Sequence, residues 1–418
     1  MNSINWSEMP LTVLKFGGTS VAGPERMKHV AKIVNKIRNS ANRVAVVVSA
    51  MGNMTDDLLA LADNVANKKN GREMDQLLAT GEQQSVALLA LALQHAGIPA
   101  QSFTALQAGI RAKGFPMEGR IYDIQPVNVE KVLNEGTVAV ITGFQAITDS
   151  GDVITLGRGG SDLSAVALSA ALGASSCQLL KDVVGVMTGD PRVVDNPVKI
   201  KEIGFEECME MTVQGANVLQ ARSVEVAARY NIPLYVGSSF VEEEGTWVMS
   251  NPVTEGLIVK AVVHDLSAAK VVILGVPDIP GVAARLFGDL AAHGVSAEMI
   301  IQNNMRGGVN DIGFLVKKTN LEDAIAVCRE LCREIDAQGV SFDTEIARVT
   351  VVGAGIANHP EIPSRMFNIL ANADINIEMI ASTSLAITCV VGSSNAEAAV
   401  RALHRDFIEE DSSQCQAK

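Results

Sequence analysis

Aromatic residues and basic clusters are scarce in this sequence of 418 residues, and both shortages narrow the range of functions. Aromatic side chains make up 4% of the chain and apolar ones 48%, so Ala, Val, Ile, Leu and Met must fill the core, as in packed α/β sheets. This composition disfavours a module that stacks bases or sugars on aromatic rings. The net charge of −13 disfavours nucleic acid and acidic membranes as partners, because both require a broad basic surface. We therefore expect a small-molecule partner.

Disulfide, metal and membrane signals are also missing. The six cysteines contain no C-x-x-C pair, which indicates reduced core thiols rather than a disulfide framework, and the six histidines show no metal-ligand spacing. The opening MNSINWSEMP lacks the basic and apolar segments of a signal peptide, and no later stretch reaches about 18 uninterrupted apolar residues. We expect a cytoplasmic protein without a metal site of its own.

Short β-rich runs alternate with longer helical stretches from Leu11 to about Tyr235. This rhythm predicts an α/β fold with a mostly parallel sheet sandwiched by helices. The helices with the clearest patterns are expected at residues 24–38, 74–97 and 161–173. The segment 241–256 is acidic, contains Gly and Pro and has little periodicity, so we place a domain boundary there.

An internal repeat follows this boundary. Residues 280–300 and 360–380 are identical at eight of 21 positions without a gap. Each copy is predicted to form a strand, a Pro-containing turn, a helix and a strand ending in Glu-Met-Ile, followed by another strand and helix. This βαββαβ pattern is typical of ferredoxin-like units, and the ungapped identities favour duplication over shared patterning alone.

Two glycine-rich loops each connect a strand to a helix. In Lys15-Phe16-Gly17-Gly18-Thr19-Ser20, the glycines let backbone N–H groups approach an anion, and Lys15 supplies a positive charge for a phosphoryl group. In Gly157-Arg158-Gly159-Gly160-Ser161-Asp162, Arg158 can hold a carboxylate bidentately, and Ser161 and Asp162 fall in the N-cap region of the helix. Either loop alone is also typical of a plain strand-to-helix turn, but the two together favour an anion site.

A third polar loop, residues 181–192, follows a predicted strand and offers Lys and Arg to nucleotide phosphates. The sequence contains neither a Walker A motif nor a G-x-G-x-x-G fingerprint, which disfavours a P-loop NTPase and a dehydrogenase.

The order and spacing of these motifs resemble the aspartate kinases, which are amino acid kinases with C-terminal tandem ACT domains. The similarity spans about residues 11 to 408. It rests on Lys15 to Val21, Ser49 to Gly52 with Thr55 and Asp56, Gly81 to Gln83, Gly143 to Gln145, Gly157 to Asp162, Asp190 to Arg192, Val218 and Leu219 with Arg222 to Glu225, and Ser238 to Phe240. The resemblance implies an amino acid kinase catalytic domain at 1–250 and ACT domains at 257–341 and 342–418.

The resemblance also implies individual roles. Lys15, Gly18 and Asp162 would be catalytic, with Asp162 orienting Lys15. Thr55, Glu82, Arg158 and Ser161 would bind substrate, with Glu82 at its α-ammonium and Arg158 at its α-carboxylate. The ATP site would comprise Lys15, Phe16, Gly17, Gly18, Thr19, Ser20, Lys181, Asp182, Val186, Met187, Thr188, Asp190, Pro191 and Arg192. An amino acid effector would contact Asp278, Gly281, Met299, Ile300, Gln302, Asn303, Asp311, Asn376 and Ile380.

The implied reaction is transfer of the γ-phosphate of ATP, with Mg²⁺, to the β-carboxylate of L-aspartate, the first step of lysine, threonine and methionine biosynthesis. A carboxylate with a pKa of about 4 is already ionised at pH 7, so no general base is required. The reaction instead requires neutralisation of two approaching anions. The ACT pair implies a homo-oligomer, dimer or tetramer, with lysine or threonine as candidate effectors.

Two departures from the family pattern stand out. The nucleotide loop reads Leu-Lys-Asp-Val-Val at 180–184 where the family usually has Tyr-Thr-Asp-Val-Asp, so Lys181 inserts a charge. This charge would strengthen phosphate binding, alter nucleotide preference or weaken the kinase; we expect retained activity because both glycine loops are whole. Residues 302–303, 310–311 and 381–386 in the ACT repeats also differ from the family pattern. Inhibition by lysine or threonine therefore stays open, and so does an ACT pair that serves only dimerisation.

Two other hypotheses remain. One is a kinase of another amino-acid carboxylate, such as glutamate or acetylglutamate, although the segment 49–56 and the ACT pair weigh against it. The other is a non-catalytic amino-acid sensor whose kinase domain has decayed at Lys181. ATP turnover separates enzyme from sensor, and substrate competition separates the kinases.

Overall fold

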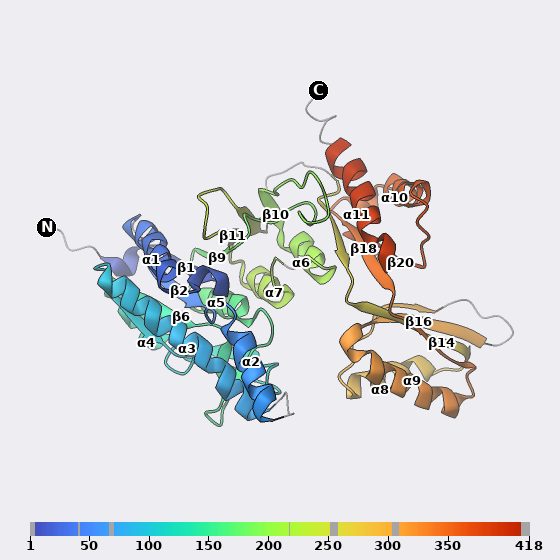
Figure 1. Ribbon diagram of the computed structural model, residues 1–418, viewed down its shortest axis with the longest axis horizontal. Helices are drawn as coiled ribbons and strands as arrows, with labels where there is room; N and C mark the ends of the chain where they lie inside the picture. The colour runs from blue at the N-terminus through green and yellow to red at the C-terminus, as the bar shows by residue number, and fades with distance from the viewer. Residues whose placement is uncertain are drawn as a thin grey trace. The chain divides into compact units, whose positions relative to one another are not determined.

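The structure is a computed structural model that describes residues 5–40, 42–66, 71–216, 218–250, 258–302 and 309–410. The chain divides into two compact units. The first comprises residues 1–187, 199–213 and 217–255, and the second residues 188–198, 214–216 and 256–418 (Figure 1).

The first unit is built on an eight-stranded sheet. Its strands, in spatial order, are β10 (Glu202–Gly204), β12 (Thr246–Met249), β11 (Leu234–Ser238), β9 (Ser176–Lys181), β1 (Leu11–Phe16), β2 (Arg43–Val48), β6 (Val138–Thr142) and β3 (Ala100–Phe103). The six strands from β11 to β3 are mutually parallel, whereas β12 runs antiparallel to β11 and β10 runs parallel to β12. The mostly parallel sheet predicted from the βαβ rhythm is confirmed.

Helices cover both faces of this sheet. Leu14 and Phe16 of β1 pack in one core cluster with residues of α1 (Pro24–Asn39) and α3 (Arg72–His95). Since successive side chains of a strand point to opposite faces, Lys15 points to the other face, where α5 (Gly160–Ala171) packs on β1, β2 and β9. The remaining helices of the unit are α2 (Met54–Val65), α4 (Val127–Asn134), α6 (Phe205–Val213) and α7 (Ala221–Tyr230), with short helices η1 (Trp6–Glu8) and η2 (Gly18–Val21).

A smaller sheet completes the first unit. Its order is β5 (Arg120–Ile124), β4 (Ile110–Lys113), β7 (Gln145–Ile147) and β8 (Val153–Thr155), and the loop after β8 leads into α5.

The large sheet has a topological switch point at β1. The chain continues from β1 to β2 on one side, whereas β9 pairs with its other side. In open parallel sheets, ligands bind beside the carboxyl ends of the strands at such a point. The loops that follow β1, β2, β6, β9 and β11 all lie at this edge, and they contain the glycine-rich run after Lys15 and the polar loop after β9. The second glycine-rich run, residues 157–162, follows β8 of the smaller sheet and leads into α5.

The second unit contains two antiparallel four-stranded sheets. One has the order β15 (Glu298–Gln302), β16 (Val309–Lys317), β14 (Ala268–Pro277) and β17 (Gly339–Asp343), and α8 (Val282–Ala292) and α9 (Leu321–Ile335) pack in its core. The other has the order β19 (Met379–Ser382), β20 (Ala386–Gly392), β18 (Ile346–Val352) and β13 (Ala261–Asp265), with α10 (Glu361–Asn372) and α11 (Ala396–His404). Short helices are η3 (Lys318–Asn320), η4 (Ile356–Asn358), η5 (Ser393–Asn395) and η6 (Arg405–Glu410).

The predicted βαββαβ order holds in the first repeat but not in the second. Within the described residues the second repeat has no strand after α11, and β13, which precedes both repeats in sequence, pairs with β18 in the place that β17 takes beside β14. The first repeat is therefore inserted between β13 and the rest of the second sheet. The residue bounds of the two ACT domains stay a prediction.

The predicted strands ending in Glu-Met-Ile were wrong. The strands instead begin at this tripeptide, at Glu298 in β15 and at Met379 in β19. Val295 and Ile375 are buried in the cores just after each helix, and the extended segments start only beyond them. The segment 241–256 also contains a strand, β12, which its weak periodicity had not indicated.

A buried arginine joins the two sheets of the second unit. Arg348 of β18 pairs with Asp265 of β13 at 2.6 Å and with Glu298 of β15 at 2.5 Å. We expect Arg348→Met to destabilise the unit by about 3–5 kcal/mol, because two partly buried carboxylates lose their cation. Denaturant unfolding of the whole chain measures this loss, and exposed Arg329→Met on α9 is the control. A change below about 1 kcal/mol would contradict the bridging role.

None of the helices in the described ranges is long and apolar enough to cross a membrane.

Candidate active site

Three charged side chains meet at the switch point of the large sheet. The Lys15 ammonium lies 2.6 Å from Oδ1 of Asp162, and the Lys181 ammonium lies 2.6 Å from Oδ2 of the same carboxylate. Lys15 and Asp162 are buried, with 6% and 3% exposure. Burial by itself raises the pKa of Asp162, but Lys15 and Lys181 together hold it below its ordinary value. Asp162 is therefore a carboxylate at neutral pH.

The loop after β1 is held by backbone contacts that require glycine. The Gly52 N–H donates to the Gly18 carbonyl at 2.9 Å, and a Cβ on Gly18 would lie 2.7 Å from the Ala50 carbonyl oxygen. The loops after β1 and β2 thus approach more closely than a side chain would allow. Of the residues predicted to cradle ATP here, Thr19 is exposed, whereas the Phe16 side chain is buried in the core.

Glu82 is a buried acid on α3. Its Oε1 accepts a hydrogen bond from the Ala50 N–H at 2.9 Å, and its Oε2 is buried without a hydrogen-bond partner. Burial raises the pKa of Glu82 to about 7, and the Ala50 N–H and Lys15 oppose this rise. Gly81 allows the contact, because a Cβ there would lie 2.8 Å from the Ala50 side chain. The unpartnered oxygen is suited to a cationic group of a ligand.

The remaining predicted substrate residues lie at helix starts. Thr55 is half-buried in the first turn of α2, and Ser161 is 7% exposed in the first turn of α5. Arg158 is exposed, and its carbonyl accepts a hydrogen bond from Gln220. None of the described residues forms a hydrogen bond or ion pair with its guanidinium, which leaves it available to a ligand.

Ser161 and Asp162 lie in the first turn of α5, within the predicted N-cap region, but neither side chain caps the helix. Gly159 is the N-cap residue, in the left-handed conformation with φ of 75°, and no side chain caps the helix. The Asp162 carboxylate does not cap the helix because it binds the ammonium groups of Lys15 and Lys181 instead.

The predicted nucleotide loop is divided between the two units. Lys181, Asp182, Val186 and Met187 belong to the first unit, where the Val186 N–H donates to Thr246. The predicted residues Thr188, Asp190, Pro191 and Arg192 belong to the second unit. There the Thr188 hydroxyl lies 2.8 Å from Nε2 of buried His404, and Arg192 pairs with Asp190 at 2.7 Å.

Several residues at this edge were missed as site residues. The Ser239 hydroxyl lies 2.8 Å from that of Ser20, and its N–H donates to the Lys181 carbonyl at 2.8 Å. Phe144 has a positive φ of 68°, an uncommon conformation for a non-glycine residue and one often found near functional sites. The sequence pattern that could have indicated them is the position of the runs 238–240 and 143–145 at the ends of strands that finish at the same edge of the sheet.

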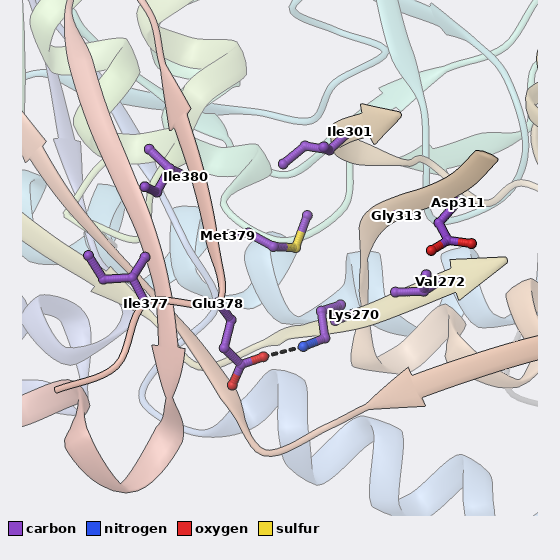
Figure 2. Close-up of a pocket in the computed structure, with 9 residues that line it drawn as sticks. All are labelled: Lys270, Val272, Ile301, Asp311, Gly313, Ile377, Glu378, Met379 and Ile380. Atoms are coloured by element: carbon purple, nitrogen blue, oxygen red, sulfur yellow. Dashed lines mark hydrogen bonds and ion pairs between the residues drawn. The ribbon is translucent and has the colours of Figure 1, made fainter. Parts of the chain in front are cut away.

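The predicted effector residues are scattered over the second unit. Asp311 and Ile380 line a cavity of about 380 Å³ with Lys270, Val272, Ile301, Gly313, Ile377, Glu378 and Met379 (Figure 2). Lys270 and Glu378 form an ion pair in this cavity, and Asp311 accepts a hydrogen bond from the Gly275 N–H at 2.9 Å.

The other predicted effector residues do not line this cavity. Met299 packs against a small apolar cluster that includes Leu315 and Val390. Asp278 accepts a hydrogen bond from Asn310, and Gly281 is the N-cap of α8. Ile300 and Asn376 are exposed, Gln302 ends β15, and Asn303 lies outside the described residues.

Comparison with known proteins agrees with this architecture. A model of the amino acid kinase family matches residues 10–238, and a model of the ACT domain matches residues 271–331 and 349–407. Fold and match together define an amino acid kinase followed by two ACT domains.

Curated aspartokinases are similar to this chain over nearly its whole length. That of Thermus thermophilus is 41% identical over 401 residues, covering 96% of this chain and 99% of its own length. That of Pseudomonas aeruginosa is 41% identical over 402 residues, covering 96% and 98%. The solved structure of E. coli aspartokinase III in complex with aspartate and ADP has a TM-score of 0.81 at 26% identity, covering 95% of this chain and 99% of that one. This chain belongs to the aspartokinase family.

Proposed function

We propose that this chain is an ATP-dependent aspartate kinase that transfers the γ-phosphate of ATP to the β-carboxylate of L-aspartate, giving 4-phospho-L-aspartate. The observation that supports this most is the buried cluster of Lys15, Asp162 and Lys181 at the switch point. Lys15 also interacts electrostatically with the carboxylate of Glu82, whose Oε2 has no hydrogen-bond partner. This arrangement offers positive charge to an anion and negative charge to an ammonium group within one site. Aspartokinase relatives, one solved with aspartate and ADP, support the assignment.

The proposed chemistry places no demand on a general base. The β-carboxylate is ionised at neutral pH, so the protein needs only to bring two anions together and offset their repulsion. Lys15 would contact the transferring phosphoryl group, and the loop held by Gly18 would present backbone N–H groups to the phosphates.

Aspartate would be bound at both ends of its α-amino-acid group. Glu82 would pair with the α-ammonium and Arg158 with the α-carboxylate, while Thr55 and Ser161 line the same pocket. The nucleotide would contact residues 15–20, 181–182 and 186–187. Thr188, Asp190, Pro191 and Arg192 are assigned to it on family resemblance alone.

Mg²⁺ would enter with the nucleotide. Throughout the parts of the chain that the structure describes, no group of three or more His, Cys, Asp or Glu side chains could hold a metal ion. Mg²⁺ is commonly bound by substrate phosphates with one or two carboxylates, so the residues present fit a phosphate-borne ion. When bound, it would neutralise phosphate charge.

Hydroxamate formation from L-aspartate, ATP and Mg²⁺ with hydroxylamine tests this function, with L-glutamate run in parallel. Wild-type protein should give an aspartate-dependent signal. Arg158→Ala should raise the KM for aspartate about 10- to 100-fold, because a charge-assisted hydrogen bond contributes about 1.5–3 kcal/mol. Exposed Arg329→Ala on α9 should behave as wild type. Folded protein without turnover of either amino acid would instead indicate a sensor, and turnover of glutamate alone another kinase.

We further propose that the ACT pair binds a regulatory amino acid, with lysine or threonine as candidates, and assembles the chain into a dimer or tetramer. The reaction would serve lysine, threonine and methionine biosynthesis. A related aspartokinase III structure contains lysine and aspartate, and the ACT repeats match the family model along most of the second unit.

A further inference from the structure

Lys181 and Lys15 reach the same carboxylate because of the strand register. In the parallel pairing of β1 with β9, Lys15 lies beside Leu179. Lys181 is two residues beyond Leu179, so it projects from the same face of the sheet as Lys15. Asp162, in the first turn of α5 on that face, contacts one lysine with each oxygen. Lys181 also donates to the Val218 carbonyl at 2.6 Å.

The cluster carries an excess positive charge. One carboxylate faces two ammonium groups, and the side chains of Lys15, Asp162 and Lys181 are only 8%, 4% and 19% exposed. Burying unbalanced charge is costly unless a counter-ion is supplied. With Asp162 and Lys15 alone, the pair would be neutral and the ammonium would be held by the full charge of the carboxylate. The second lysine changes this balance in favour of an incoming anion.

We infer that Lys181 is a positioning residue that binds Oδ2 of Asp162 and thereby lets Lys15 leave Oδ1 for the phosphoryl group of ATP. This inference rests on the proposed kinase function. As Lys15 turns to the phosphate, Lys181 keeps the buried carboxylate neutralised, so Asp162 neither retains Lys15 nor repels the nucleotide. Lys181 acts through Asp162, whatever its backbone contributes near the nucleotide.

Direct contact between the Lys181 ammonium and the nucleotide is the competing role. The ammonium has three donors, and Asp162 and Val218 already accept from two of them. The two roles predict different kinetics: a positioning residue changes the chemical step, whereas a nucleotide ligand changes nucleotide affinity.

Lys181→Met and Lys181→Arg in the full-length chain separate these roles. We expect Lys181→Met to lower kcat about 10- to 100-fold, by analogy with the loss seen when the hydrogen-bonded partner of a metal ligand is removed. The Kd for ADP should change less than about threefold. Lys181→Arg should recover part of kcat because it keeps a cation on Asp162. Exposed Lys131→Met on α4 is the matched control, and melting curves confirm that each variant is folded.

The dependence of kcat on pH provides a readout that a structural role would not change. Burial and then the charge of Lys15 lower the pKa of Lys181, while Asp162 and Asp182 oppose this shift. Lys181 therefore loses its proton at lower pH than an ordinary lysine, and kcat should fall with it on the alkaline side. Arginine stays protonated, so Lys181→Arg should remove this alkaline loss.

Each outcome has one meaning. Unchanged kcat in Lys181→Met, or a Kd for ADP raised more than tenfold at unchanged kcat, overturns the positioning role, the latter in favour of direct nucleotide contact. An alkaline loss that persists in Lys181→Arg also overturns it. A wild-type chain without aspartate turnover refutes the proposed kinase and this inference together. An active wild type whose Lys181 variants have the same kcat as the wild type refutes the inference alone.

Discussion

Lys15→Met is expected to lower kcat for aspartate phosphorylation about 1,000-fold while leaving the protein folded. Lys15 is the buried cation on the face of β1 that packs against α5, and removing one preorganised charge of this kind typically costs about 100- to 1,000-fold in rate. We place the value at the upper end because two anions must be brought together at this point. A coupled assay of ADP release measures the loss.

The charge balance explains why this variant should fold. After Lys15→Met, Asp162 and Lys181 still form a 1:1 ion pair at 2.6 Å. Asp162→Asn, in contrast, would leave two buried ammonium groups without a carboxylate and should melt at a lower temperature than Lys15→Met. Lys131→Met serves again as the exposed control. Activity of Lys15→Met within tenfold of wild type would contradict the role assigned to Lys15.

Glu82→Gln is expected to raise the KM for aspartate about 10- to 100-fold and to remove the dependence of KM on pH near neutrality. Glutamine can still accept the hydrogen bond from the Ala50 N–H but carries no charge for the substrate ammonium. In the wild type the pKa of Glu82 is raised to about 7, so the carboxylate form declines as pH falls below 7. The wild-type KM should therefore rise by up to about tenfold from pH 7.5 to pH 6.

The same substitution should stabilise the protein at alkaline pH. An acid whose pKa rises from 4.5 to about 7 on folding costs stability as pH increases through that interval, by about 3 kcal/mol above pH 7. Glu82→Gln avoids this cost, so its melting temperature should exceed that of the wild type at pH 8 and the difference should shrink towards pH 5. Exposed Glu130→Gln on α4 should show neither effect. A Glu82→Gln enzyme with unchanged KM at pH 7.5 would remove Glu82 from the substrate site.

The strands and helices of the first unit were predictable because each carries its own pattern. The runs at 11–16 and 43–51 are apolar and β-branched, and they form β1 and β2, while the pattern at 24–38 forms α1. Two strand pairings were not predicted, that of β12 with β11 and that of β13 with β18, and both involve short strands. β12 has four residues and β13 five, too few for periodicity to distinguish them from loops.

The candidate site was predictable in its residue types but not in its contacts. Strand, glycine loop and helix in succession indicated an anion site at Lys15 and a carboxylate site at Arg158. The contact of a second lysine, Lys181, with Asp162 was not predictable. Lys181 stood out in the sequence only as a departure from the family pattern, and its partner lies 19 residues earlier on a different element.

The sequence by itself determined which elements form, which loops can approach an anion, and that a unit near the C-terminus is duplicated, because these properties depend on neighbouring residues. Only the tertiary structure decided that β13 completes the second sheet, that Glu82 is buried with one oxygen unpartnered, and that Lys15 and Lys181 share Asp162. Strand register and burial set these features, and both depend on residues far apart in the chain.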